Sequence, residues 1–205
     1  MTDFEHFEHF EHVSGGAIPG RQGPSYRLWR RGKPSIPILV ASPHGGRSYP
    51  DDVLACLRDP EQTRLRLEDR YIDAVARPVA QATSSSLLLA EAPRAMIDLN
   101  RSVDDVDWGM VRGAKPGRVR HSLANRRSRS GLGLVPRRIP GMGEIRQRPL
   151  VKAELDAWIE AIYVPYHAAL AAELERLRDN WGVALLVDLH SMPPLKKAHA
   201  QDRPA

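Results

Sequence analysis

The sequence predicts a three-layer α/β/α fold in which helices flank a central mixed, mainly parallel sheet. Short apolar runs alternate with helical segments between residues 26 and 190, an order typical of layered α/β folds. The chain has 205 residues, of which 42% are hydrophobic, and this suits one domain with a sizeable core. No apolar run approaches the roughly 18 to 20 residues that cross a bilayer, so we expect no membrane partner.

Residues 1–24 are predicted to be a disordered tail, and residues 25–205 a folded domain. The tail carries the tripeptide repeat FEHFEHFEH at residues 4–12. Its three histidines would hold a metal ion only loosely, because a disordered repeat has no preset geometry and its ordering entropy opposes binding. The single cysteine, Cys56, cannot form an internal disulfide, and the N-terminus shows no secretion signal. Both features indicate a cytoplasmic location.

The first half of the domain is predicted to contain one strand and two helices. The apolar run at residues 36–41 predicts a buried strand. Pro50 is followed by two aspartates that open a short helix. The pair Asp59–Pro60 then predicts an N-cap followed by proline at the first helical position. The helix after it, over residues 61–80, has apolar side chains at helical spacing on one face: Leu65, Ile72, Val75, Ala76 and Val79.

The second half is predicted to contain three strands and a long helix. Two strands are expected at residues 84–90 and 94–99. A helix follows over residues 151–180, interrupted near Pro165 because proline lacks the backbone N–H that a helix interior requires. The apolar run at residues 183–190 predicts the last strand and completes the α/β pattern.

Residues 102–149 form a long irregular segment rich in Gly, Pro and Arg, and such loops often serve a functional site. From Arg112 to Arg138 there are eight arginines and one lysine but no acidic residue. This stretch would attract a small anionic substrate or a nucleic acid, and a solvated loop is the alternative. Because no aromatic residue lies among these arginines, nucleic acid is the less favoured partner.

Two predicted strands end on a histidine. His44 is followed by Gly45 and Gly46, and His190 is followed by Ser191. In parallel sheets ligands gather beyond the carboxyl ends of the strands, so both imidazoles would reach one crevice. A single histidine in such a place is more often structural, but two at matching strand ends favour shared chemistry. A catalytic zinc ion held by two histidines and a carboxylate is a common arrangement of this kind.

The third ligand would be Glu68 or Asp69. In the predicted helix over residues 61–80 these two acids lie near the apolar face, on either side of Ile72. An acid on a buried face needs a positive partner, which would be a metal ion or a nearby arginine. The pattern alone leaves both the choice of acid and the choice of partner open.

The stretch RAMIDLNR, residues 94–101, is a further candidate for ligand binding. Asn100 and Arg101 would together bind a carboxylate, the arginine through two parallel hydrogen bonds. Arg94, at the other end of the stretch, would polarise a carbonyl or add a second cation. The alternative is that Asn100 and Arg101 only end the strand.

Six motifs together resemble the N-formylglutamate amidohydrolase family. In chain order they are SPHGGRSYP (42–50), EDRYID (68–73), RAMIDLNR (94–101), GLGLVPR (131–137), YVPYHAAL (163–170) and VDLHSMP (187–193). Their order and spacing over residues 36–193 are more specific than any one motif. The resemblance implies a zinc-dependent amide hydrolase whose fold is related to those of zinc carboxypeptidases and aspartoacylases.

The resemblance also implies roles for individual residues. Three correspond to the ligands of a Zn²⁺ ion: His44, Asp69 and His190. Three more correspond to the group that binds the substrate carboxylate: Arg94, Asn100 and Arg101. The implied reaction is hydrolysis of an N-acyl amino acid, first of all N-formyl-L-glutamate, to formate and glutamate. His167, within YVPYHAAL, is interpreted as a helix-packing residue.

The general base is where the sequence departs from these relatives, which typically use a glutamate on a strand after the second histidine. After His190 the sequence continues for 15 residues with one acid, Asp202, and no glutamate. Three explanations stay open: the sequence is C-terminally incomplete, Glu68 acts as the catalytic base, or the protein binds metal without efficient turnover. A nucleic-acid-binding protein that uses residues 112–138 is the alternative of a different class.

Overall fold

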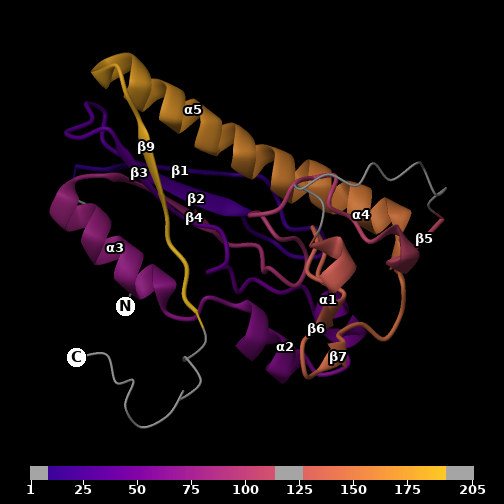
Figure 1. Ribbon diagram of the computed structural model, residues 1–205. Coiled ribbons are helices and arrows are strands. Elements are labelled where there is room, and N and C mark those ends of the chain that lie inside the picture. Colours follow the sequence, from indigo (N-terminus) through magenta and orange to yellow (C-terminus); the bar gives the residue numbers. More distant parts are fainter. Residues whose placement is uncertain (1–8, 114–126, 193–205) are drawn as a thin grey trace, which may run out of the picture.

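A five-stranded mixed sheet forms the centre of the molecule (Figure 1). The computed structural model describes residues 9–113 and 127–192. The strands lie in the order β1 (Glu11–Gly15), β2 (Tyr26–Arg30), β4 (Ser86–Ala90), β3 (Ile38–Ser42) and β9 (Leu185–Asp188). β2 runs antiparallel to both of its neighbours, whereas β4, β3 and β9 are parallel to one another. The predicted mixed sheet is confirmed, but its parallel part is limited to β4, β3 and β9.

The helices connect these strands and cover both faces of the sheet. They are α1 (Asp51–Cys56), α2 (Pro60–Leu67), α3 (Ile72–Thr83), α4 (Lys152–Trp158), the π-helical turn η3 (Ile159–Tyr163) and α5 (Val164–Trp181). The irregular segment between β4 and α4 holds the short elements η1 (Trp108–Met110), β5 (Val111–Arg112), η2 (Ser128–Ser130), β6 (Arg138–Ile139), β7 (Gly143–Glu144) and β8 (Leu150–Val151). The predicted helical interruption is confirmed, because a π-helical turn precedes Pro165.

Alternate residues of the central strand β4 pack against opposite helical layers. Leu87 and Leu89 belong to the core cluster that contains Ala76 and Ala80 of α3. Leu88 belongs to the larger cluster on the other face, which includes buried residues of α5. Since neighbouring side chains of a strand point to opposite faces, β4 is buried on both sides, as its uninterrupted apolar sequence requires.

Two sequence predictions about the sheet are corrected. Residues 94–99 form turns rather than a strand; after Pro93 the chain folds back, and the amide of Met96 donates to the Pro93 carbonyl. Their apolar character reflects burial within the core instead. Residues 11–15, predicted as part of the tail, form the edge strand β1, in which Val13 pairs with Leu28 of β2. Residues 1–8, and residues 114–126 of the basic stretch, lie outside the described residues.

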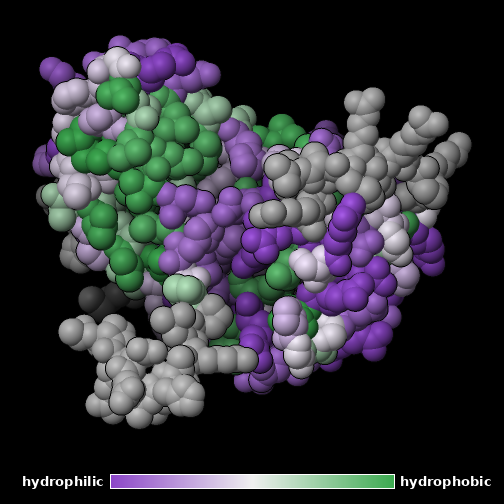
Figure 2. Space-filling model, viewed as in Figure 1, coloured by the Kyte–Doolittle hydropathy of each residue, from purple (hydrophilic) through white to green (hydrophobic). Residues whose placement is uncertain are grey.

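The other edge of the sheet exposes apolar side chains. On and beside β9, Val183 is 57% exposed and Leu185 is 53% exposed. Figure 2 shows an apolar area on this side of the molecule, where β9 runs across the face. Among the described residues, no helix combines the length and apolar character needed to span a membrane.

Candidate metal centre

His44 lies at the carboxyl end of β3, in a turn that only small residues permit. A Cβ atom on Gly46 would approach the Ala92 carbonyl oxygen to 2.1 Å, so a side chain at this position would clash with backbone. A Cβ atom on Gly45 would meet Ile72, the first residue of α3, at 3.0 Å. The two glycines therefore let the chain turn tightly against its neighbours, which leaves the imidazole of His44 buried beneath the sheet edge at 3% exposure.

Asp69 is brought to His44 by a break between two helices. The predicted single helix over residues 61–80 is wrong: α2 ends at Leu67 and α3 begins at Ile72. Tyr71, with φ of 64°, adopts the left-handed conformation that reverses the chain between them. The backbone amide of Asp69 donates to the His44 carbonyl at 3.0 Å, so the break is held directly against the end of β3.

His190 reaches the same place from the neighbouring strand. β9 pairs in parallel with β3, with Asp188 opposite Ala41, and the amide of Leu189 extends the pairing to the Ala41 carbonyl at 2.8 Å. The two strands therefore end side by side, and the ring centroids of His44 and His190 lie 4.7 Å apart. The predicted convergence of the two histidines is confirmed.

The three side chains form a compact group of nitrogen and oxygen donors. One donor atom from each of His44, Asp69 and His190 lies within 4.8 Å of the others. Asp69 Oδ2 is 2.9 Å from His190 Nδ1 and 3.7 Å from His44 Nδ1. Two donors bound about 2 Å from a shared ion lie up to about 4 Å apart, so this spacing is close to what a single metal ion requires.

The two ring nitrogens of His44 have different surroundings. Nε2 lies 2.7 Å from Oδ1 of Asp98, a carboxylate that is fully buried. Nδ1 faces Asp69 but is buried without a hydrogen-bond partner. A buried polar atom of this kind normally has a partner. Metal-bound histidines characteristically use one nitrogen for the metal and the other for a carboxylate, and His44 fits that arrangement with Nδ1 as the donor.

His190 has the same two-sided arrangement in a more exposed position. Its Nδ1 faces Asp69, while its Nε2 is 3.0 Å from Asp188 Oδ2 and 3.1 Å from the side-chain amide of Asn100. The imidazole side chain is 31% exposed, so the group opens to solvent on the His190 side. A substrate would approach from that side, because His44 and Asp69 are buried.

The electrostatics of the group keep its carboxylates ionised. Burial would lower the pKa of His44, but the neighbouring carboxylates of Asp69 and Asp98 outweigh it and raise that pKa above the ordinary value. Burial conversely opposes ionisation of the two acids, yet contacts with His44 and His190 lower the pKa of Asp69. Contacts with His44 and Arg94 hold the pKa of Asp98 at about 2. A metal ion would take the place of the proton as the positive partner.

The three predicted carboxylate-binding residues lie around Asp98. Arg94 donates from Nε to Asp98 Oδ2 at 2.9 Å, and the backbone amide of Asn100 donates to Oδ1 at 2.9 Å. Arg101 lies 3.6 Å from the same carboxylate, and it also donates to the Leu132 carbonyl. The stretch 94–101 therefore lies next to the metal group. It turns around Asp98, to which the sequence analysis assigned no role.

Glu68 is not part of the donor group. Its side chain is 2% exposed and lies 3.4 Å from Arg64 and 3.6 Å from Arg70. It also neighbours Tyr49, whose pKa is raised first by burial and then by the Glu68 charge. The sequence left open whether the positive partner of the acid is a metal ion or an arginine. For Glu68 the partners are arginines. Asp69 instead faces the two histidines.

Asp98 and Asp188 are the site residues that the sequence interpretation missed. Both had a readable signal: Asp98 is an acid within an apolar run, bracketed by two arginines, and Asp188 is an acid at the end of an apolar strand two residues before His190. An acid in such an apolar context needs a partner. In the structure the partner of Asp98 is Nε2 of His44, and the partner of Asp188 is Nε2 of His190.

Replacing Asp98 with asparagine is expected to weaken metal binding roughly 10- to 100-fold, the usual cost of losing the outer partner of a metal-bound histidine. Asparagine keeps the size of the side chain but removes the charge that orients His44 through Nε2. The affinity is measured by titration with Zn²⁺ against a chromogenic chelator. Asp104→Asn, at an exposed position nearby, is the control. An unchanged affinity in Asp98→Asn would contradict the proposed arrangement.

Comparison with known proteins gives the family of the chain. The sequence model of the N-formylglutamate amidohydrolase family matches residues 36–205, which include all three members of the donor group. The chain belongs to this family. It is 34% identical over 157 residues to an N-formylglutamate deformylase from Pseudomonas putida, and 30% identical over 164 residues to one from Pseudomonas aeruginosa. These matches cover 77% and 80% of this chain.

The fold of this N-formylglutamate amidohydrolase family member is shared with solved structures. An N-formylglutamate amidohydrolase from Ralstonia eutropha JMP134 superposes with a TM-score of 0.72 at 32% identity, covering 82% of this chain and 58% of that one. A protein from Agrobacterium tumefaciens superposes at 0.60 with 18% identity, over 86% of this chain and 60% of that one, and shows the fold alone. The chain spans about half the length of the two curated relatives, 52% and 54%.

Proposed function

We propose that this chain is a zinc-dependent amidohydrolase that cleaves an N-acyl amino acid, in the first place N-formyl-L-glutamate, into formate and glutamate. The observation that carries the proposal is the buried Nδ1 of His44, which lacks a hydrogen-bond partner and faces Asp69 beside His190. The names of the relatives supply the substrate, since two are N-formylglutamate deformylases. The lone Cys56 supports a cytoplasmic location as part of the same proposal.

The residues of the chain suit metal-assisted hydrolysis. A bound zinc ion would polarise the formyl carbonyl and lower the pKa of an attacking water to about 7. His44 and His190 would present Nδ1 to that ion, and Asp98 and Asp188 would fix the two rings by accepting hydrogen bonds from Nε2. The open His190 side would admit the formyl group, while the buried side of the group excludes bulk water.

Arg94 is the best placed residue for binding a carboxylate of the substrate. Its Nε is held by Asp98, and among the described residues no partner is found for its two terminal nitrogens. These remain available for the paired hydrogen bonds that a carboxylate accepts from arginine. Arg101 is more fully engaged, because it donates to the carbonyls of Leu132 and Asn100 as well as facing Asp98.

Glu68 was the candidate for the general base from sequence. Its contacts with Arg64 and Arg70 support a structural role instead, because they hold the carboxylate away from the donor group of His44, Asp69 and His190. We propose that it holds the short link between α2 and α3, and thereby the position of Asp69.

The proposal is tested by measuring formate release from N-formyl-L-glutamate with purified protein. The protein is first freed of metal with a chelator and then supplied with one equivalent of Zn²⁺. We expect turnover with zinc and a loss of at least 100-fold without it, because both the polarised carbonyl and the activated water depend on the ion. Undiminished turnover without metal would overturn the proposal. Stoichiometric zinc without formate release would replace it with a metal-binding but catalytically silent family member.

A further inference from the structure

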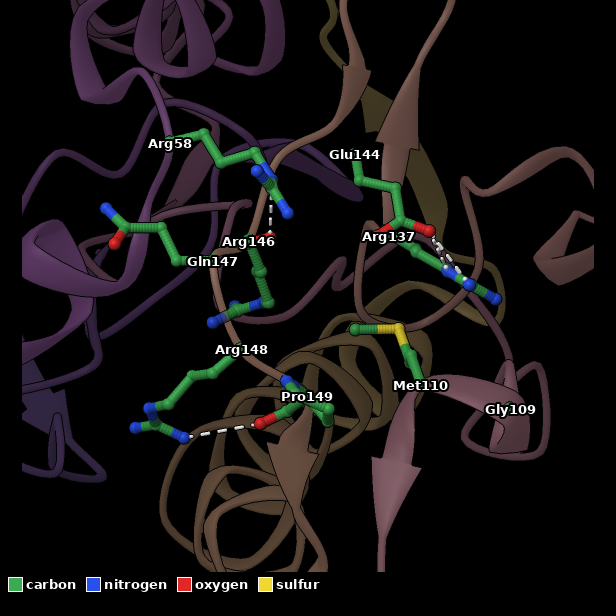
Figure 3. Close-up of a pocket in the computed structure, with 9 residues that line it drawn as sticks. All are labelled: Arg58, Gly109, Met110, Arg137, Glu144, Arg146, Gln147, Arg148 and Pro149. Carbon is green, nitrogen blue, oxygen red and sulfur yellow. Dashed lines mark hydrogen bonds and ion pairs between the residues drawn. The ribbon is translucent and has the colours of Figure 1, made fainter.

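A cavity lies between Arg58 and the irregular segment after β4, and it shares no residue with the metal group (Figure 3). It has a volume of about 110 Å³, and four of its lining residues are arginines: Arg58, Arg137, Arg146 and Arg148. By comparison, a cavity of roughly 10–15 Å³ suffices for one water molecule. Glu144 is the single acidic residue in the lining, so the cavity carries a strong positive charge.

Two of the arginines are already neutralised. Arg137 lies 2.8 Å from Glu144 and 3.0 Å from Asp107. Arg148 makes a two-pronged ion pair with Glu154, at 2.7 and 2.8 Å. The acid in the lining is therefore occupied by Arg137, and it does not balance the remaining two cations.

Arg146 is a buried cation without a counter-ion. The residue is 8% exposed, and its Nη2 donates to the Ala95 carbonyl at 2.7 Å. Its guanidinium lies over the ring of Trp158, 5.1 Å from the centroid. Nε is buried without any hydrogen-bond partner, and no carboxylate of the described residues lies within 4.0 Å of the side chain. Burial lowers the pKa of Arg146 to about 10, so the side chain is still charged at neutral pH.

Arg58 is the second arginine of the cavity for which the described residues offer no acidic partner. Its Nε donates to the backbone carbonyl of Arg146 at 2.9 Å, and within the described part of the chain it too has no ion pair. Figure 3 shows the Arg146 side chain between those of Arg58 and Arg148, on one wall of the cavity. An unpaired buried charge is costly and is normally met by an opposite charge.

We propose that this pocket binds a small oxyanion, such as a phosphate or a carboxylate group, between Arg146 and Arg58. The exposed Arg58 would attract the ion, and the guanidinium of Arg146, which lines the cavity, would donate to it. The pocket is a separate site, because none of its lining residues belongs to the metal group. The two sites are nevertheless structurally linked, since Ala95, which accepts from Arg146, directly follows Arg94.

The test is calorimetric titration of inorganic phosphate into the metal-free full chain at constant ionic strength, because salt screens exposed charges. We expect saturable binding of one phosphate. Arg146→Met should weaken it about 10- to 100-fold, the usual effect of losing a hydrogen bond to a charged group, and Arg58→Met should weaken it less. Arg66→Met, which removes an exposed arginine of α2, is the control and should bind as the wild type does.

Two results would overturn the proposal: the absence of saturable binding, or an Arg146→Met variant that binds as tightly as the wild type. His44→Ala should bind phosphate normally, so failure of the proposed metal function leaves this test intact. If Arg146→Met does not fold, Arg58→Met is compared with wild type for a phosphate-dependent rise in Tm, and an equal rise in both would count against the site. A competition experiment with glutarate distinguishes the two kinds of ligand. If glutarate displaces phosphate, the pocket accepts organic carboxylates. If glutarate does not displace it, the pocket is selective for phosphate.

Discussion

His44→Ala is expected to abolish stoichiometric metal binding and, with it, metal-dependent release of formate. The variant removes the donor Nδ1 itself, so the loss of affinity should exceed the roughly 10- to 100-fold effect of losing an outer partner. It also leaves the buried carboxylate of Asp98 without its imidazole, although Arg94 still pairs with that acid. Metal content after dialysis, measured by elemental analysis, reports the result directly.

The matched control is His167→Ala. His167 lies on α5 with its ring 4.2 Å from that of Tyr163, and it is not a member of the donor group. This substitution also removes one partly buried histidine, but it should leave one metal ion bound per chain. A His44→Ala protein that retains one ion, or a His167→Ala protein that loses it, would refute the ligand assignment.

Glu173→Ala is expected to destabilise the fold by about 1–3 kcal/mol, the usual cost of removing a buried carboxylate from its hydrogen-bond partners. Glu173 is 1% exposed on α5 and ties that helix to the sheet. Its carboxylate accepts from Ser86 of β4 and pairs with Arg176, while Arg30 of β2 lies 3.9 Å away. In the variant Ser86 loses its acceptor and Arg176 loses its ion-pair partner, whereas Arg30 keeps its pair with Glu11.

The free energy of unfolding is measured by urea denaturation of each variant. Glu175→Ala is the control, because Glu175 is an exposed residue of the same helix. A surface substitution of this kind should change stability by no more than about 0.5 kcal/mol. Equal stabilities for the two variants would show that the carboxylate of Glu173 does not hold α5 to the sheet.

The sequence predicted the convergence of the histidines because it depends on simple rules. Apolar runs identified β3 and β9, and parallel strands end at the same edge of a sheet. In the structure Asp188 pairs with Ala41, and this register places His44 next to His190. The ligand roles of the two histidines remain predictions, but their proximity follows from local pattern and topology alone.

The position of Asp69 could not be predicted in the same way. Apolar residues continue at helical spacing through the break at residues 68–71, so periodicity favoured one continuous helix. The structure shows that several of these side chains are exposed; Leu65 is 49% exposed and Val75 is 54% exposed. The break is set by the tertiary contact between the Asp69 amide and the His44 carbonyl, which no local pattern encodes.

The stretch RAMIDLNR was misjudged for a related reason. A short apolar run is compatible with any fully buried backbone, and here Met96 and Ile97 are buried in turns rather than in a strand. The turn points Asp98 inward to His44, so the acid at its centre orients the proposed ligand while Arg94 and Arg101 surround that acid. Only the three-dimensional arrangement distinguishes these roles.

Anomalous diffraction at the zinc absorption edge, from crystals of the full chain grown with one equivalent of Zn²⁺, tests the central claim most directly. The account predicts a single strong peak about 2 Å from Nδ1 of His44, Nδ1 of His190 and a carboxylate oxygen of Asp69. A peak bound elsewhere on the chain, or no peak between these three side chains, would contradict it.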